Sequence, residues 1–170
     1  SFGTWAMALA AAFVLFAVVI TASYVAAASA RKRLFSEVAD LHVASLASSS
    51  PVDVVSTDRH TVKPWFQGKI PFSFDLPELR NTDFTLVGGR MAYLNQTPGA
   101  QLIYDVRKHH ISVFIFPETA FGTASARLSS VPKDLPFHLE TWTQRNLRYF
   151  VIGDTNPEDL NQLAKLFKTE

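Results

Sequence analysis

The stretch WAMALAAAFVLFAVVITASY, residues 5–24, decides how this chain is organised. It contains no charged side chain, and none occurs anywhere between residues 2 and 30. An α-helix rises about 1.5 Å per residue, so roughly 20 apolar residues cross a bilayer core of about 30 Å. Trp5 and Tyr24 stand at its two ends, where amphipathic rings favour the headgroup level. Residues 1–30 are therefore predicted to form a single transmembrane helix in a lipid bilayer.

Two other interpretations of this stretch fit less well. Ala28-Ser29-Ala30 resembles a signal-peptide cleavage site, but the apolar run is longer than the usual signal core of about 7–15 residues and no basic segment precedes it. A buried core helix of a small domain would show a polar stripe, and this stretch has none. Because the chain opens at Ser1 rather than at methionine, we expect further residues upstream.

Composition excludes several classes of function. The net charge is +1, which gives no strongly basic face for direct binding of nucleic acid. The absence of cysteine excludes disulfides, thiolate chemistry and cysteine-bound zinc in these residues, and leaves the redox compartment open. The 14 phenylalanines can build a core without such supports.

Residues 31–50 are predicted to form a juxtamembrane helix and linker. Three basic residues, Arg31, Lys32 and Arg33, follow the anchor and by themselves favour a cytoplasmic C-terminal side. This rule compares both flanks, however, and the other flank is missing. The apolar positions between residues 34 and 46 have helical spacing, which suits either packing on the chain's own domain or a dimer seam.

Residues 51–170 are predicted to be an α+β domain, with an antiparallel sheet of about five strands and flanking helices. A glycine kink at Gly88-Gly89 and a type II turn at Pro98-Gly99 are expected within the hairpins. A capped helix should begin within Thr155-Asn156-Pro157-Glu158-Asp159. The expected strands are residues 52–55, 84–94, 100–107, 111–116, 137–145 and 148–152, with a long loop over residues 117–136.

The segment between residues 58 and 72 sets a charged cluster beside two prolines and three aromatic rings. Asp58 is expected to cap a short helical turn that Pro64 ends. We expect Trp65 and Phe66 to cover one face of the sheet as a structural lock, since large aromatic rings are mostly core. The alternative is an exposed docking patch for a partner.

Each candidate catalytic, metal or phosphate site in the sequence is explained more simply by a structural role. His109 and His110 are adjacent and point to opposite sides, so they do not share a metal easily. The cluster Asp58-Arg59-His60 has no partner nucleophile, and the Gly88-Gly89-Arg90 sequence lies within a strand rather than before a helix. We therefore predict no enzymatic activity, no metal and no cofactor.

Two motifs carry a family resemblance. DRHTVKPWFQGK at residues 58–69 and FTLVGGR at residues 84–90 resemble the C-terminal half of membrane-bound bacterial anti-sigma factors, over about residues 38–117. The motif residues, with a structural or an interaction role, are Asp58, Arg59, His60, Lys63, Pro64, Trp65, Phe66, Gly68, Gly88, Gly89 and Arg90.

The resemblance implies a transcription regulator of the bacterial inner membrane. A cytoplasmic segment before Ser1 would hold a sigma factor, often through a small zinc-binding helical module, and residues 51–170 would be a periplasmic sensor domain. This orientation opposes the one that Arg31, Lys32 and Arg33 favour, and it is preferred because the charge rule lacks its second flank. The alternative is an accessory or assembly subunit of a membrane complex, which would carry only a short tail upstream.

Overall fold

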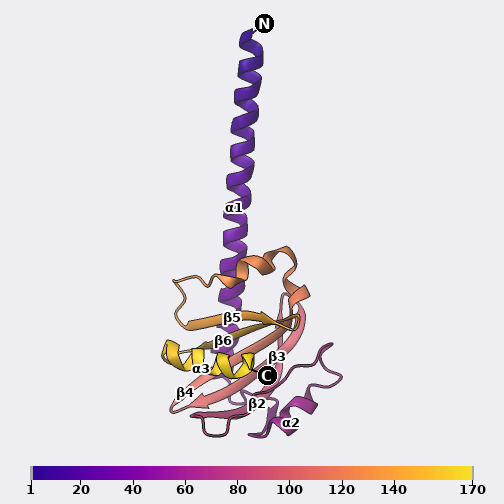
Figure 1. Ribbon diagram of the computed structural model, residues 1–170, viewed down its shortest axis with the longest axis vertical. Coiled ribbons are helices and arrows are strands. Elements are labelled where there is room, and N and C mark those ends of the chain that lie inside the picture. Colours follow the sequence, from indigo (N-terminus) through magenta and orange to yellow (C-terminus); the bar gives the residue numbers. More distant parts are fainter. Residues whose placement is uncertain (1, 170) are drawn as a thin grey trace.

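The computed structural model, which describes residues 2–169, shows a long helix that rises from a compact domain (Figure 1). Helix α1 (Phe2–Leu46) has 45 residues and is the one described helix that is long and apolar enough to cross a membrane. None of its most apolar 18-residue window is buried within the protein. The apolar stretch and the juxtamembrane segment thus form one uninterrupted helix.

The domain is built on one antiparallel sheet in the order β1-β2-β3-β4-β6-β5. Its strands are β1 (Val54–Val55), β2 (Phe84–Leu94), β3 (Thr97–Val106), β4 (His109–Pro117), β5 (His138–Gln144) and β6 (Leu147–Gly153). The α+β prediction is confirmed, with six strands rather than about five. The two-residue β1, which lies within the strand expected over residues 52–55, pairs with Gly88 and Gly89 at the edge of β2.

Alternating side chains give the sheet two apolar faces. On the first face, Tyr104, Val113 and Val151 pack beneath helices α2 (Arg59–Trp65) and α3 (Pro157–Lys168). On the second face, Phe114, Phe116 and Phe150 pack against α1 and the 3-10 helix η1 (Glu118–Ser129). Strand β4 is therefore buried on both sides, as its continuous apolar sequence predicts.

The lower part of α1 belongs to the second face. Phe35 and Val38 are fully buried there, with Leu34 and Ala39 beside them. His42, also fully buried, places its Nδ1 atom 2.8 Å from the Ser112 hydroxyl on β4. Of the two interpretations open for this segment, packing on its own domain is the one observed.

Several local predictions are confirmed. Asp58 caps α2 by accepting a hydrogen bond from the His60 N–H at 2.8 Å. Asn156 caps α3 in the same way, accepting from the Asp159 N–H at 2.8 Å. The expected kink in β2 is a shift of register between Leu86 and Gly88.

Three local predictions are wrong. The turn before β3 lies at Asn95 and Gln96, which both have positive φ, while Pro98 and Gly99 belong to the strand. Gly99 is required there for close approach, because a Cβ atom would come within 2.3 Å of the Phe116 ring. Pro64 lies inside α2 instead of ending it, and the predicted loop after β4 contains η1.

Candidate functional site

The two motif segments meet in one packed unit. Phe66, at the end of α2, is only 2% exposed and lies directly over Gly89 of β2. A Cβ atom on Gly89 would come within 2.8 Å of the Phe66 ring and 3.2 Å of Val62. Because real Cβ atoms do not approach other atoms as closely as 2.8 Å, glycine at position 89 lets α2 settle on the sheet.

Strand β1 pairs with the Gly88-Gly89 segment of β2 and approaches it closely. A Cβ atom on Gly88 would lie 2.1 Å from the Val54 carbonyl oxygen, so β1 can pair only with a glycine there. The Arg90 guanidinium reaches back to the carbonyl of Pro51 at 3.5 Å. The glycine pair is therefore a packing requirement on both sides of β2.

Trp65 and Phe66, the expected structural lock on the sheet, are buried to different degrees. Phe66 is buried, whereas Trp65 is half-buried and meets the Phe66 ring edge-on, with 5.0 Å between the centroids. The Lys69 ammonium lies 4.3 Å from the centre of the Trp65 ring and donates to the Trp65 carbonyl at 2.7 Å. Gly68, at φ 75°, allows the chain to turn back for this contact. Phe66 is thus the deeper anchor of the pair.

A pair of ion contacts ties α2 to the far end of the sheet. Asp75 accepts from the Lys63 ammonium at 2.6 Å and from the Arg145 guanidinium, at the β5–β6 turn, at 2.7 Å. The hydrogen bond from Lys63 is the main reason that the pKa of Asp75 is lowered. The carboxylate thus joins the motif helix to a hairpin distant in sequence.

Beside α2 lies a cleft of about 210 Å³, which we call the α2 cleft. Its lining residues are Thr57, Asp58, Arg59, His60, Leu76, Pro77, Glu78, Leu79, Arg80, Leu86 and Tyr104. A second hollow of about 310 Å³, with Lys63, Pro64 and Asp75 in its lining, adjoins it. Arg59, His60 and Leu76 line both, so they stand at the boundary between the two spaces.

The charges of the α2 cleft largely compensate one another. Arg59 donates to the Leu76 carbonyl at 3.0 Å and lies 3.5 Å from the Glu78 carboxylate. Arg80 pairs with the same carboxylate at 3.4 Å. Burial acts to raise the pKa of Glu78, but the positive charges of Arg80 and Arg59 outweigh it and lower this pKa. The cleft therefore offers a polar rim without a strong excess of either sign.

Tyr104 belongs to the inner lining of the cleft. The side chain is 1% exposed, and its hydroxyl has no hydrogen-bond partner among residues 2–169. Burial raises the pKa of this phenol, so it stays protonated and able to donate. In the described residues no hydrogen bond joins the His60 ring to a nucleophile; the backbone N–H of His60 donates to Asp58.

The sequence singled out Asp58, Arg59 and His60, which line one wall of this cleft, but it predicted neither the cleft nor its other wall. Glu78 and Arg80 lie in a connection that carries no periodic signal, so nothing in the sequence placed them opposite Arg59. Tyr104 could have been found, because it shares a strand face with Leu102 and Val106. A phenol at such a buried position usually requires a hydrogen-bond partner.

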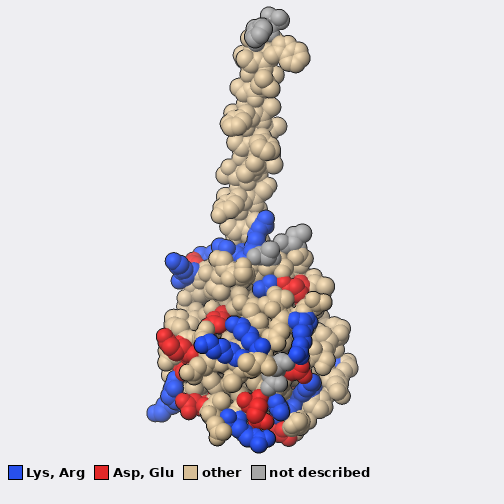
Figure 2. Space-filling model, viewed as in Figure 1, with Lys and Arg blue, Asp and Glu red and all other residues tan. Residues whose placement is uncertain are grey.

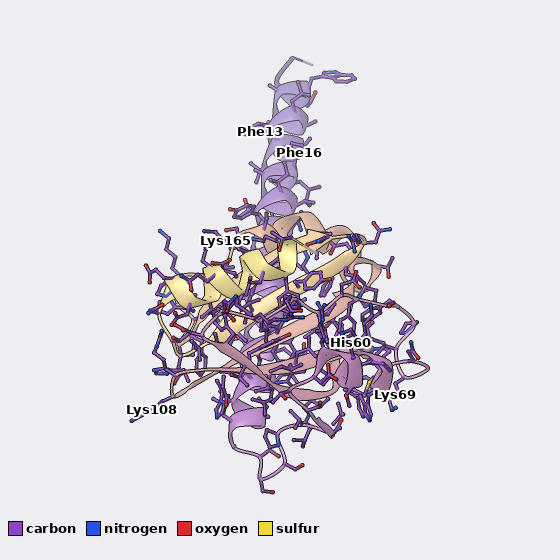
Figure 3. The ribbon with its side chains drawn as sticks, turned by 60° about the horizontal axis from the view of Figure 1, so that its bottom comes forward. Phe13, Phe16, His60, Lys69, Lys108 and Lys165 are labelled. Carbon is purple, nitrogen blue, oxygen red and sulfur yellow. The ribbon has the colours of Figure 1, made fainter. Side chains whose placement is uncertain are left out.

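The remaining predicted positions lie elsewhere. Trp5 and Tyr24 are 74% and 77% exposed on the projecting part of α1. Figure 3 places His60 on α2, well away from Phe13 and Phe16 of that helix. The anchor ends and the motif residues therefore form two separate regions.

The histidines do not converge. His109 contacts Asp154 at 3.1 Å, whereas His110 pairs with Asp105 of the neighbouring strand. No group of three or more His, Asp or Glu side chains with the spacing of a metal site occurs within residues 2–169.

No protein-family model, no curated protein and no solved structure matches this chain.

Proposed function

We propose that this chain is the anchor and extracytoplasmic domain of a single-pass, membrane-bound bacterial anti-sigma factor, whose sigma-binding segment precedes Ser1. One observation carries the proposal: the two segments that resemble this family, residues 58–69 and 84–90, pack against each other through Phe66 and Gly89. A shared packing unit is the reason that two separate motifs would occur together in one sequence.

The architecture supports a role in passing a signal through a membrane. The lower part of α1 packs on the second face of the sheet, while α2 and its cleft lie on the first face. A partner bound at the α2 cleft would be separated from α1, the proposed membrane helix, only by the thickness of the sheet. Because packed interiors have low compressibility, a displacement on one face reaches the other.

The proposal includes an orientation. The domain would lie in the periplasm and the missing segment in the cytoplasm, with α1 crossing the inner membrane. Support comes from the apolar helix, which is long enough for one crossing, and from the family resemblance.

Sigma-factor binding tests this proposal. The full-length protein, with its native residues before Ser1, would be purified in detergent and titrated with each sigma factor of its own bacterium. We expect one of them to bind the full-length protein, and none to bind residues 1–170 alone. If no sigma factor binds the full-length protein, and its upstream segment is only a short tail, the chain is instead an accessory subunit of a membrane complex.

A further inference from the structure

Cations gather where α1 enters the domain. Figure 2 shows Lys and Arg side chains where the uncharged, projecting part of the helix meets the domain. Arg31, Lys32 and Arg33 follow the apolar stretch directly, and Lys32 forms an ion pair with Asp134. If α1 spans a bilayer, this level of the molecule coincides with the lipid headgroups.

A cleft of about 230 Å³, the junction cleft, lies between α1 and the end of η1. Arg31 and Arg127 line it from opposite elements, together with the hydroxyls of Ser129 and Ser130, Tyr24 and two alanines of α1. Among the described residues, no acidic side chain belongs to this lining. Two guanidinium groups thus share one small space without a carboxylate to offset their repulsion.

Both arginines lack partners within the described part of the chain. Neither Arg31 nor Arg127 makes a hydrogen bond or an ion pair there, and the Nε atom of Arg31 is buried without a partner. Buried donors are nearly always hydrogen-bonded, so this N–H indicates an acceptor that the chain does not supply. Their situation contrasts with the α2 cleft, where Glu78 compensates the cations.

The wall that carries Arg127 is held firmly on the sheet. Arg148 of β6 donates two hydrogen bonds to the Glu118 carboxylate at the start of η1, at 2.6 and 2.9 Å. It also donates to the Ser125 carbonyl at 3.1 Å. Phe121 and Leu128, which belong to η1, are buried against the second face of the sheet. The two walls of the junction cleft are therefore both attached to the same core.

We propose that the junction cleft binds the phosphate of an anionic phospholipid headgroup, such as that of phosphatidylglycerol, in the leaflet next to the domain. Guanidinium groups match phosphate oxygens with paired N–H donors, and the Ser130 hydroxyl adds a further donor. The cleft adjoins the apolar surface of α1, along which acyl chains would run, and this favours a lipid over free phosphate. The inference rests on the membrane anchoring within the proposed function and does not depend on a sigma factor.

Lipid retention by the intact chain tests the inference. The protein would be solubilised in mixed micelles with equal amounts of phosphatidylglycerol and phosphatidylcholine, and bound lipid would be measured by native mass spectrometry. The test variant is Arg31→Gln with Arg127→Gln. The matched control is Lys108→Gln with Lys165→Gln. It removes the same charge from two exposed positions that do not line the junction cleft.

We expect the native chain to retain phosphatidylglycerol preferentially and the control to match it. The test variant should lose preference on the order of twentyfold, since each basic residue near an anionic surface contributes about fivefold in affinity. Equal preference in the test variant and the native chain would overturn the inference. So would inorganic phosphate at millimolar concentration that displaces the lipid from the native chain.

Carbonate extraction of membranes that contain the native chain separates two kinds of failure. A chain that stays in the membrane but shows no preference contradicts only the lipid site. A chain that is released by carbonate contradicts the membrane anchor, and with it both this inference and the proposed function.

Discussion

At the scale of single residues, the contact between Phe66 and Gly89 explains why an aromatic residue and a glycine occur in separate motifs. The ring occupies the space that a side chain at position 89 would need. The sequence indicated that Phe66 is a core residue, and its burial agrees. The sequence did not indicate that Phe66 contacts Gly89, because this contact depends on how the irregular segment between α2 and β2 runs.

Gly89→Ala should destabilise the domain by about 1–3 kcal/mol, the usual cost of forcing extra volume into a packed core. Phe66→Ala should cost about 3–5 kcal/mol, since it removes a buried ring. In a Phe66→Ala background the Gly89→Ala change should cost clearly less, because the ring it strikes is gone. Urea unfolding of the full chain in detergent gives all the free energies that this cycle needs.

Strict additivity of the two changes would contradict the contact. Trp65→Ala serves as the comparison at the neighbouring position. Because Trp65 is half-buried, its truncation should cost less than that of Phe66, although it is the larger ring.

At the scale of elements, α1 serves two different surroundings. Its first part is apolar on every side and exposed, as a membrane helix is. Its last part has a buried face that contains Phe35 and Val38, while Val43 and Leu46 are about half exposed. Anchor and domain are therefore joined without a flexible linker.

Phe35→Ala should loosen the attachment of α1 to the sheet. We expect a loss of about 3–5 kcal/mol, the usual cost of truncating a buried phenylalanine. Val43→Ala, at a position 45% exposed, is the control and should change stability by less than about 1 kcal/mol. Hydrogen exchange should rise in β4 and β6 for the first variant only; unchanged exchange there would refute the docking.

The attachment of η1 should depend on pH. Burial acts to raise the pKa of Glu118, but hydrogen bonds from Arg148 and Ser125 outweigh it and lower the pKa. A lowered folded-state pKa means that this carboxylate stabilises the fold above its unfolded pKa, and that the contribution disappears as pH falls through the folded value.

Glu118→Gln should therefore cost about 1.5–3 kcal/mol at pH 7, typical of hydrogen bonds to a charged group, and progressively less as the pH approaches 3. Glu158→Gln, on the exposed start of α3, should have little effect at either pH. Urea unfolding at both pH values measures the difference. A penalty that stays constant with pH would show that the charge of Glu118 is not involved.

Elements were easier to predict than their contacts. The hairpins, the capped helix α3 and the kink in β2 all carry local signals in caps, glycines and alternating side chains. The turn before β3 was misplaced because Pro98-Gly99 is a typical turn pair, whereas the glycine is there for the Phe116 ring. The 3-10 helix η1 was missed because its Ser-, Ala- and Gly-rich sequence has no helical periodicity.

At the scale of the whole molecule, one sheet connects three regions: the α2 cleft on its first face, α1 on its second, and the junction cleft at the base of the anchor. The motif residues on one wall of the α2 cleft could be named from the sequence, although the cleft itself could not. The opposing wall and the whole junction cleft could not, because both depend on where connections of irregular structure return to the sheet. In this arrangement, the proposed signal path runs from α2 through the sheet to α1.

The central claim is that α1 carries this domain to the far side of the membrane from the segment before Ser1. Paired fusions after Glu170 test it most directly, with alkaline phosphatase, which is active only in the periplasm, and a fluorescent protein that matures only in the cytoplasm. We predict phosphatase activity and no fluorescence from the full-length chain. Fluorescence without phosphatase activity would contradict it, and would place the domain on the side that Arg31, Lys32 and Arg33 favour by charge alone.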